Sequence, residues 1–306
     1  MNIAVIGSNM VDLITYIDRM PKEGETLEAP DFKMGCGGKG ANQAVAASKF
    51  KSDVMMVSKV GDDLFGENTI KNLKDNDINT EFVTIQKNQA SGVAPIFVDK
   101  NSKNSILIIK GANKNLSPQD IDDASEQLKK CSLIVLQLEI NIETVYYAID
   151  FANKNHIPVL LNPAPCIPDL DLNYICKCDF FAPNESELGI LTNKPVSTVY
   201  EIREAAHYIS DKNVKNVIVT MGSKGVLWLN NNEEYFVEAY KVNAIDTTGA
   251  GDAFIGCFAH FYVTTKDVLL SLKRATAFAA LSVTRYGTQS SYPTKDEFEG
   301  YVKENN

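Results

Sequence analysis

Residues 246–252 read Asp-Thr-Thr-Gly-Ala-Gly-Asp, and they lead into the apolar run Ala-Phe-Ile-Gly-Cys-Phe-Ala at 253–259. Small and apolar residues of this kind are typical of a buried helix. Small residues at a helix start leave backbone N–H groups bare, and these groups together with the helix dipole bind anions. Asp252 beside such a turn could remove the proton of an alcohol that attacks a phosphoryl group. Alternatively, Gly249 and Gly251 form a tight turn and Asp252 caps the helix.

The composition is that of an ordinary soluble globular protein. The 306 residues are 44% hydrophobic and 23% charged, and the formal net charge is −9. The chain has no basic stripe, which argues against nucleic-acid binding, and no apolar run approaches the roughly 18 residues that cross a membrane. Residues 1–7 indicate a first strand and not a signal peptide, so we expect a cytoplasmic protein.

The cysteines and histidines show no metal-binding pattern. Without a secretion signal, the six cysteines are expected to be reduced thiols. Cys176 and Cys178 are separated by one residue, which is a poor metal spacing, and no second pair completes four ligands. The histidines stand far apart, at 156, 207 and 260, so we expect structural or surface roles for them.

Buried β-branched runs alternate with amphipathic stretches along the chain. This alternation predicts an α/β fold in which helices cover both faces of a parallel sheet. The predicted strands are 3–6, 54–60, 133–138, 158–161, 180–182 and 217–221. The predicted helices are 41–49, 67–76, 117–130, 142–155 and 199–213.

Two segments, at about 13–34 and 92–111, interrupt this alternation. They contain strand-like runs without intervening helices, at 15–17, 94–98 and 105–109. We expect a small accessory sheet that could cover a cleft, or pair through its apolar face with a second subunit. Alternatively, this part is a hairpin without a function. No linker or repeat divides the chain, which predicts one α/β domain over 1–306 with this sheet inserted.

Residues 35–40 read Gly-Cys-Gly-Gly-Lys-Gly and formally fit the dinucleotide-binding fingerprint. That fingerprint belongs in the first βα turn, and no clear acidic residue ends a second strand about 20 residues later. The phosphate-binding P-loop does not fit either, because no Ser or Thr follows Lys39. What remains is a glycine-rich turn that exposes Lys39 and Asn42, whose groups suit a small polyol.

Further polar side chains follow predicted strands at their carboxyl ends, where open α/β sheets bind ligands. Asn9 and Asp12 follow the first strand, and Glu139 follows 133–138. Residues 184–187, Asn-Glu-Ser-Glu, could hold Mg²⁺, or the Asn could cap a helix with both Glu residues in its first turn. Residues 220–225 could approach a nucleotide or form a hairpin turn.

Two of these motifs resemble the signatures of the ribokinase-like carbohydrate kinases. They are 37–44, Gly-Gly-Lys-Gly-Ala-Asn-Gln-Ala, and 246–252. Minor motifs recur in matching order at 3–8, 162–165, 183–185 and 287–291, so the resemblance covers nearly the whole chain. It implies a three-layer α/β/α fold with a mostly parallel central sheet and a β lid that forms a homodimer. It also implies ATP-dependent phosphorylation of a sugar 5-hydroxyl, with Mg²⁺ and a monovalent cation such as K⁺.

The same resemblance implies roles for individual residues. Asp252 would be the base, and the anion hole would be formed by the N–H groups of Gly249, Ala250 and Gly251. The sugar would be held by Asp12, Gly38, Lys39, Asn42 and Glu139. The nucleotide site would be lined by Asn184, Thr220, Gly222, Ser223, Gly225, Gly251 and Thr276, with Glu187 near Mg²⁺. The monovalent cation would be held, mostly through carbonyls, by Asp246, Thr248, Ser282, Arg285, Gly287 and Ser291.

One departure from the family pattern bears on the substrate. The family run Gly-Ser-x-Asn-x-Asp reads Gly-Ser-Asn-Met-Val-Asp at 7–12, so Met10 stands where an Asn contacts sugar hydroxyls. An Asn can bond the 2-hydroxyl of ribose, whereas a thioether offers apolar contact to a CH₂. We therefore predict 2-deoxy-D-ribose as the preferred sugar, by at most roughly 10²-fold over D-ribose. Alternatively, Met10 is ordinary packing and Asn9 replaces the amide, although successive strand residues face opposite ways.

Two other functions stay open at this point. One is a kinase of the same fold that acts on ribose, fructose or a nucleoside. The other is a non-catalytic protein that senses a sugar or binds a dinucleotide. Asp246 and Asp252 argue against the second, because a protein that only binds has no reason to keep both carboxylates.

Overall fold

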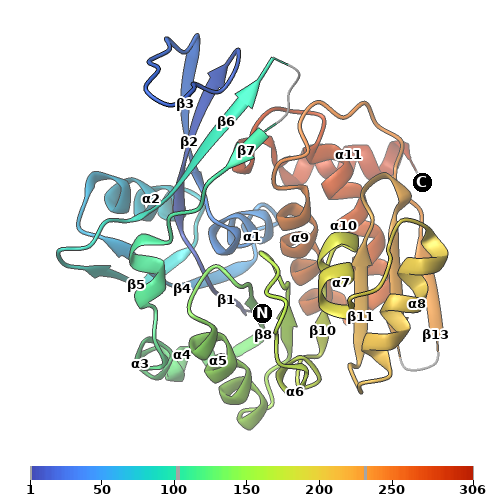
Figure 1. Ribbon diagram of the computed structural model, residues 1–306. Coiled ribbons are helices and arrows are strands. Elements are labelled where there is room, and N and C mark those ends of the chain that lie inside the picture. Colours follow the sequence, from blue (N-terminus) through green and yellow to red (C-terminus); the bar gives the residue numbers. More distant parts are fainter. Residues whose placement is uncertain (1, 101–103, 231–232, 306) are drawn as a thin grey trace.

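The computed structural model describes residues 2–100, 104–230 and 233–305, and its centre is one large sheet (Figure 1). Within these residues the sheet has nine strands in the order β13-β12-β11-β10-β9-β8-β1-β4-β5. The parallel strands are β5 (Asn79–Gln86), β4 (Asp53–Gly61), β1 (Asn2–Ile6), β8 (Cys131–Leu136), β9 (Val159–Leu161), β10 (Phe180–Phe181) and β11 (Asn216–Thr220). At one edge β12 (Val226–Asn230) and β13 (Glu233–Val237) continue antiparallel.

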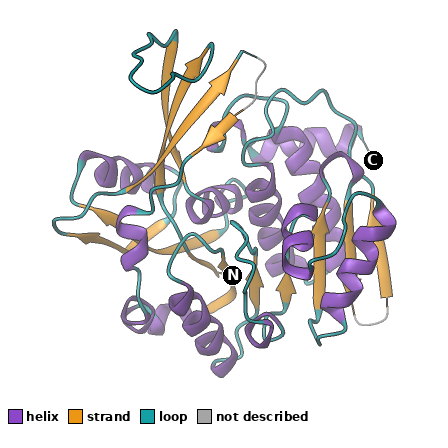
Figure 2. Cartoon of the chain, in the orientation of Figure 1, coloured by secondary structure: helices purple, strands orange, loops and turns teal. Residues whose placement is uncertain are grey.

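Helices cover both faces of this sheet, as Figure 2 shows. Alternate residues of each strand point to opposite faces, so β1 sends Ile3 and Val5 into one core and Ala4 and Ile6 into the other. The first face is covered by α1 (Lys39–Ser48), α2 (Leu64–Asp75), α9 (Ala250–Thr265), α10 (Val268–Ser282) and α11 (Lys295–Glu304). The second is covered by α3 (Pro118–Asp123), α4 (Ser125–Leu128), α5 (Ile142–Lys154), α6 (Leu172–Ile175), α7 (Glu185–Thr192) and α8 (Val199–Ser210). The α/β fold class is therefore confirmed.

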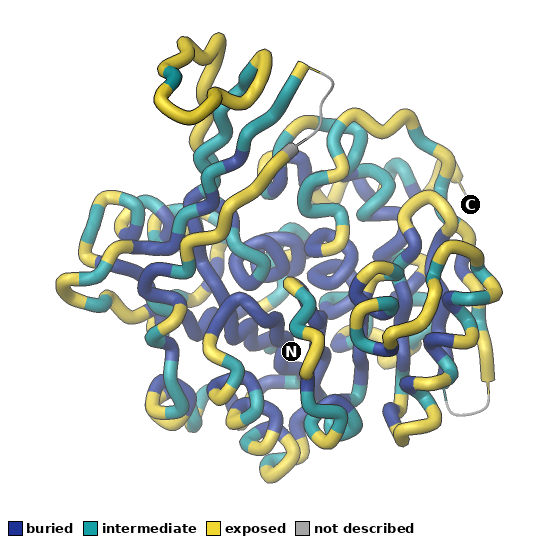
Figure 3. Tube along the Cα trace, in the orientation of Figure 1, coloured by how far each residue is buried: buried dark blue, intermediate teal, exposed yellow. Residues whose placement is uncertain are grey.

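A second, four-stranded sheet projects from this body (Figure 1). Its strands, in spatial order, are β3 (Asp31–Gly37), β2 (Met10–Ile17), β6 (Gly92–Asp99) and β7 (Asn104–Ile106). Its outer end is largely exposed, whereas the central strands of the large sheet, such as β1 and β8, are buried (Figure 3). We call it the small sheet. It begins at Met10, earlier than the predicted segment, because β2 follows β1 after only three residues.

Several predicted boundaries were wrong, most of them by one to three residues at the end of a helix or strand. The helix predicted over 117–130 is divided at Ala124, where Asp122 and Asp123 place negative charge at the carboxyl end of α3, which the helix dipole disfavours. The strand predicted over 133–138 ends at Leu136, and the one over 105–109 ends at Ile106. None of the described helices is long and apolar enough to cross a membrane.

Helices α1 and α9 lie side by side on the first face, and their close contact depends on a glycine. A Cβ on Gly256 would stand 2.4 Å from the carbonyl oxygen of Gln43 and 2.5 Å from Cβ of Ala46. Only a residue without a side chain therefore allows this approach. As a result, the first turn of α9 faces the first turn of α1, and the two signature motifs meet.

Candidate active site

The turn before α9 has the geometry of an anion-binding site. Gly249 has φ +76°, and a Cβ on it would stand 2.4 Å from Cγ2 of Thr288, so both conformation and space require glycine. The space beside Gly251 is open, because apart from its chain neighbours and the backbone of its own helix no described atom lies within 4 Å of where its Cβ would be. The buried Tyr292 donates its hydroxyl to the carbonyl of Gly249 at 3.3 Å. The first N–H groups of α9 thus face an open space at a fixed turn.

Asp252 lies in the first turn of α9, and α1 holds its carboxylate from the opposite side. Nδ2 of Asn42 donates to Oδ2 at 3.0 Å, and Nε2 of Gln43 donates to Oδ1 at 2.9 Å. All three residues are buried: the exposed fraction is 7% for Asp252, 6% for Asn42 and 1% for Gln43. Residues 210 positions apart in the sequence therefore fix the direction of one carboxylate.

Glu139 connects the end of β8 to the glycine-rich turn before α1. Its Oε2 accepts the backbone N–H of Lys39 at 2.8 Å and the hydroxyl of Ser8 at 2.5 Å. The Ser8 hydroxyl also accepts the N–H of Gly40. Burial raises the pKa of the Glu139 carboxyl, and the positive charge of Lys39 partly offsets this rise. Glu139 therefore positions Lys39 in addition to standing at the edge of the site.

The charges of carboxylates from three parts of the chain act on the ammonium group of Lys39. Its pKa is raised mainly by Asp252, with further contributions from Glu139 and Glu187 that oppose the effect of burial. Glu187 belongs to α7, on the second face of the sheet. The predicted base, sugar and Mg²⁺ residues therefore lie close enough to influence one another's charge.

Five of the predicted nucleotide residues, Asn184, Thr220, Gly222, Ser223 and Gly225, lie at the ends of β10 and β11, whereas Gly251 lies on α9 and Thr276 on α10. Asn184 forms a bridge to Thr220, and the Thr220 N–H donates to Pro183 at 3.1 Å. The turn Gly222–Lys224 connects antiparallel strands β11 and β12, so this segment is a hairpin turn, one of its two predicted readings. Gly225 has φ +106°, and a Cβ there would stand 2.2 Å from the carbonyl oxygen of Val237. The hydroxyl of Thr276 donates to Leu272 within α10.

Asn184 and Glu187 also cap α7. The Asn184 side chain accepts the N–H of Glu187, and the Glu187 carboxylate accepts the N–H of Asn184, both at 2.8 Å. This capping box agrees with the alternative interpretation of residues 184–187, in which the Asn caps a helix with both Glu residues in its first turn. The described residues contain no cluster of three His, Cys, Asp or Glu side chains that could hold a metal. One carboxylate beside substrate phosphates is nevertheless a normal environment for Mg²⁺, which keeps several waters.

The residues predicted to hold a monovalent cation lie on two loops that are tied together. Oδ1 of Asp246 accepts the N–H of Thr248 and Oδ2 accepts the N–H of Gly287, both at 2.9 Å. The N–H groups of residues 245 and 246 also donate to Val283, next to Ser282. Ser291 donates its hydroxyl to Thr288. Arg285 pairs with Glu297 through its guanidinium, which leaves only its backbone for a cation.

A cleft of about 890 Å³ lies between the small sheet and these loops. Asp12 and Ile14 line it from β2, and Thr248 and Gly287 line it from the loops. Asp12 also touches the glycine-rich turn, since a Cβ on Gly37 would stand 2.3 Å from one of its carboxylate oxygens. Of the sugar residues predicted from the sequence, Asp12 lines this cleft, whereas Gly38, Lys39, Asn42 and Glu139 are not among its lining residues.

Comparison with known proteins identifies the fold and chemistry. The family model described as pfkB family carbohydrate kinase matches residues 1–295. The chain belongs to the pfkB family of carbohydrate kinases. Deoxyribokinase of Salmonella typhi is 64% identical to this kinase over 305 residues, which is 100% of both chains. Ribokinase of Dictyostelium discoideum is 40% identical over 313 residues, covering 97% of this chain and 98% of the relative.

Solved structures of ribokinases have the same fold as this pfkB kinase. Ribokinase of Thermotoga maritima has a TM-score of 0.89 at 35% identity, covering 98% of this chain and 99% of the other. Arabidopsis thaliana ribokinase, complexed with ribose and ATP, has a TM-score of 0.91 at 30% identity and 98% coverage of both. The predicted family resemblance is confirmed, and the protein is a phosphotransferase with a sugar hydroxyl as acceptor.

Several side chains of this pfkB kinase site were not predicted from the sequence. Gln43 donates to Asp252 and to Oδ1 of Asn162 at 3.1 Å, and it accepts the amide of Gln137 at 2.7 Å. Gln43 and Asn162 both stand in motifs that the sequence singled out. A linear motif does not tell which of its side chains faces Asp252, so these contacts required the three-dimensional arrangement.

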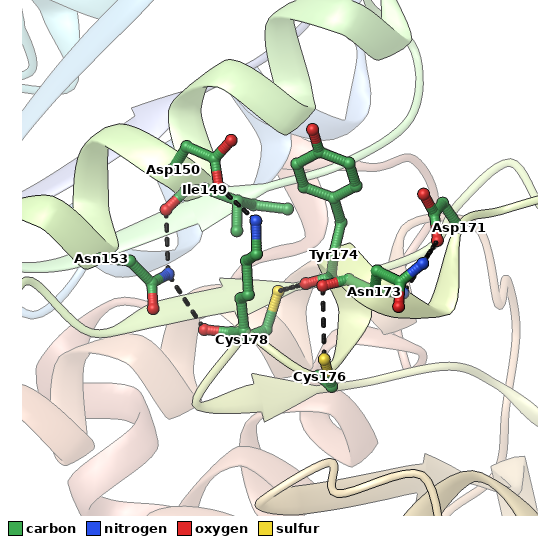
Figure 4. Close-up of polar contacts among 9 residues, drawn as sticks. Ile149, Asp150, Asn153, Asp171, Asn173, Tyr174, Cys176 and Cys178 are labelled. Carbon is green, nitrogen blue, oxygen red and sulfur yellow. Dashed lines mark hydrogen bonds and ion pairs between the residues drawn. The ribbon is translucent and has the colours of Figure 1, made fainter.

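The cysteine pair on either side of Lys177 lies next to residues of α5 and α6 in the pfkB kinase (Figure 4). The thiol of Cys176 donates to the carbonyl of Asn173, and the thiol of Cys178 donates to the carbonyl of Tyr174. Burial raises the pKa of the Cys178 thiol well above its ordinary range. Among the residues described, the cysteines are free thiols. This agrees with the expected reduced state.

The raised pKa of Asp12 predicts that replacing this carboxylate makes the pfkB kinase more stable but less active. Burial, followed by the charges of Glu139 and Asp252, raises its pKa from 3.8 to about 7. Between these values the folded state binds more protons than the unfolded state, so ionisation of Asp12 lowers stability as the pH rises. We expect Asp12→Asn to raise the free energy of unfolding by roughly 1–3 kcal/mol at about pH 8, and to change it little at about pH 4.

Urea unfolding of both proteins at the two pH values tests this expectation. Activity at about pH 8 should fall in the variant, because a carboxylate accepts hydrogen bonds from sugar hydroxyls more strongly than an amide does. Equal free energies of unfolding of the wild type and Asp12→Asn at about pH 8 would contradict the raised pKa of Asp12.

Proposed function

We propose that this protein transfers the γ-phosphoryl group of ATP to the 5-hydroxyl of 2-deoxy-D-ribose, and more weakly of D-ribose. The products are 2-deoxy-D-ribose 5-phosphate and ADP. The observation that carries the proposal is the carboxylate of Asp252, held by Asn42 and Gln43 beside the glycine turn. The 64% identity to a deoxyribokinase supports the choice of sugar, and the likeness to a ribokinase complexed with ribose and ATP supports the donor.

In this mechanism the protein supplies one base and several positive or dipolar groups. Asp252 accepts the proton of the 5-hydroxyl while that oxygen attacks the phosphorus in line with the leaving ADP. The N–H groups of Gly249, Ala250 and Gly251 donate to the oxygens of the transferring group, and Lys39 offsets their charge. Asp12 and Asn42 orient the sugar hydroxyls.

The proposal includes two cations. Glu187 would hold Mg²⁺, directly or through water, and this ion would neutralise charge on the phosphates. A monovalent cation such as K⁺ would lie between the loops of Asp246 and Gly287 and add positive field beside the anion hole. The hydrogen bonds that join these loops support a rigid carbonyl site there.

We further propose that residues 1–306 form one ribokinase-like domain whose small sheet acts as a lid and as the contact of a homodimer. Half-exposed apolar side chains on the small sheet, such as Phe32 and Ile106, support a surface that becomes covered. A cytoplasmic location agrees with the free thiols.

The preference for deoxyribose depends on Met10. This side chain is 1% exposed and stands on β2 two residues before Asp12, so both belong to the same face of the strand. A Cβ on Gly92 would stand 3.0 Å from Cγ of Met10, which shows how closely its side chain is packed. An apolar group here lowers the affinity for a 2-hydroxyl without blocking the sugar.

The alternative role for Asn9 requires its side chain to turn toward the sugar. Its backbone is fixed on both sides by Asn113, which accepts the Asn9 N–H at 2.9 Å and donates to the Asn9 carbonyl at 3.0 Å. The Asn9 amide is buried, and neither of its polar atoms has a hydrogen-bond partner in the described part of the chain. These hydrogen bonds fix the backbone of Asn9 and leave its side chain free to rotate, so the kinetics of Met10→Asn have to decide between the two roles.

Kinetics of Met10→Asn test the sugar preference. We expect the ratio of kcat/KM for deoxyribose to that for ribose to fall by about tenfold or more, because the amide can bond the 2-hydroxyl. The matched control is Met10→Leu, which stays apolar and should keep the wild-type ratio. An unchanged ratio in Met10→Asn would remove the argument from Met10, although the kinase activity itself would stand.

A further inference from the structure

Gln289 belongs to neither signature motif, yet its side chain connects indirectly to the catalytic base. Nε2 of Gln289 donates to Oδ1 of Asn42 at 2.9 Å. Nδ2 of the same Asn42 donates to Oδ2 of Asp252 at 3.0 Å. At its other end, Oε1 of Gln289 accepts from Nδ2 of Asn72 at 2.8 Å. Three amides from α2, the loop before α11 and α1 therefore form a chain that ends at Asp252.

The chemistry of the groups fixes the direction of this chain. An ionised carboxylate only accepts hydrogen bonds, so Asn42 must turn its NH₂ toward Asp252 and its oxygen toward Gln289. Gln289 must then present its own NH₂ to Asn42 and its oxygen to Asn72. If residue 289 presented an acceptor instead, a rotated Asn42 amide could donate its NH₂ to that acceptor. The rotation would place the Asn42 oxygen against the carboxylate of Asp252.

Gln289 also stands on the loop that contacts the anion-binding turn. Two residues earlier, the N–H of Gly287 donates to Asp246. The intervening Thr288 fills the space in which a Cβ of Gly249 would lie. The short helix Gln289–Ser291 is thus in contact with the turn before α9 and, through Asn42, with the base on the first turn of α9.

We propose that Gln289 is a positioning residue. It fixes the Asn42 amide so that an N–H group, and not an oxygen, faces Oδ2 of Asp252, and it thereby sets the direction of the catalytic carboxylate. The inference depends on the proposed role of Asp252 as the base. Gln289 does not touch the reacting atoms, so its loss affects turnover more than the binding of ATP.

Two substitutions distinguish this role from simple packing. Gln289→Met nearly keeps the volume and removes both hydrogen bonds, whereas Gln289→Glu keeps the shape and the acceptor for Asn72 but loses the donor to Asn42. We expect kcat to fall about fivefold to tenfold in Gln289→Met, with the KM for ATP within about twofold of wild type. Gln289→Glu should be at least as impaired. The control is Ser290→Ala, on the same loop but outside the amide chain, which should behave as wild type.

A double-mutant cycle tests whether Gln289 acts through Asn42. In an Asn42→Ala background, Gln289→Met should change kcat by less than about twofold, because the amide that it positions is gone. Equal effects in the two backgrounds, or a Gln289→Glu variant milder than Gln289→Met, would overturn the inference. Asp252→Asn is measured in parallel. Normal turnover of Asp252→Asn would contradict the role of Asp252 as the base. A large loss of turnover in Asp252→Asn, together with normal turnover of the Gln289 variants, would contradict only the role of Gln289.

Discussion

Asp252→Asn is expected to lower kcat by about 10²–10⁴-fold, the contribution that general base catalysis makes in enzymes. The amide has nearly the same shape as the carboxylate but cannot take the proton of the sugar hydroxyl. It also has one acceptor oxygen where the carboxylate has two, so it cannot satisfy both Asn42 and Gln43. We therefore expect turnover to collapse while the sugar still binds within a few-fold of wild-type affinity.

An assay of ADP release, together with titration calorimetry of the sugar, separates these two effects. Asp267→Asn is a suitable control, since Asp267 caps α10 by accepting the N–H of Leu270, and Asn caps helices equally well. The control should retain wild-type kinetics. Turnover within tenfold of wild type in Asp252→Asn would contradict the assignment of the base.

Lys39→Met is expected to lower kcat by about 10²–10³-fold, comparable to the loss of one electrostatic contact in an oxyanion hole. Lys39 is the cation on which the charges of Asp252, Glu139 and Glu187 act. Without it, these carboxylates and the negative phosphates of the donor have less positive charge to offset them. The KM for the sugar should rise as well, because Glu139 loses part of the charge that holds its pKa down.

Lys49→Met is the matched control for charge and side-chain length. Lys49 caps the carboxyl end of the same helix, and its ammonium group donates to Asn76 at 3.0 Å. Steady-state kinetics should show a change of less than about twofold in this control. Equal losses in the two variants would mean that the effect comes from net charge and not from the place of Lys39.

The sequence predicted the parts of the fold that local pattern determines. The strands of the large sheet are continuous β-branched runs because both of their faces are buried, and this pattern is visible without a structure. The glycine turn before α9 was equally visible, because Gly249 and Gly251 leave N–H groups bare whatever their surroundings. The boundaries were predicted less well. The division at Ala124 follows two aspartates whose effect on the helix end was not weighed, and β2 starts at Met10, only three residues after β1.

The sequence singled out many residues of the candidate site, but it did not predict the contacts between them. Asn42 and Asp252 each stood out, yet their hydrogen bond joins residues 210 positions apart. Gln43 was part of a motif without an assigned role, and Gln289 lay in a weaker one. Arg285 was predicted as a cation residue, and only the structure reveals its pairing with Glu297. Such pairings depend on the approach of α1 to α9, which Gly256 makes possible.

The position of the transferred phosphate tests the central claim most directly. Phosphorus–proton correlated NMR of the product, made from ATP and 2-deoxy-D-ribose, identifies the carbon that bears the new phosphate. Our account predicts three-bond coupling of the phosphorus to the two protons on C5, and none to the protons on C1 or C3. Phosphate on another hydroxyl, or no transfer to deoxyribose or ribose at any concentration, would contradict it.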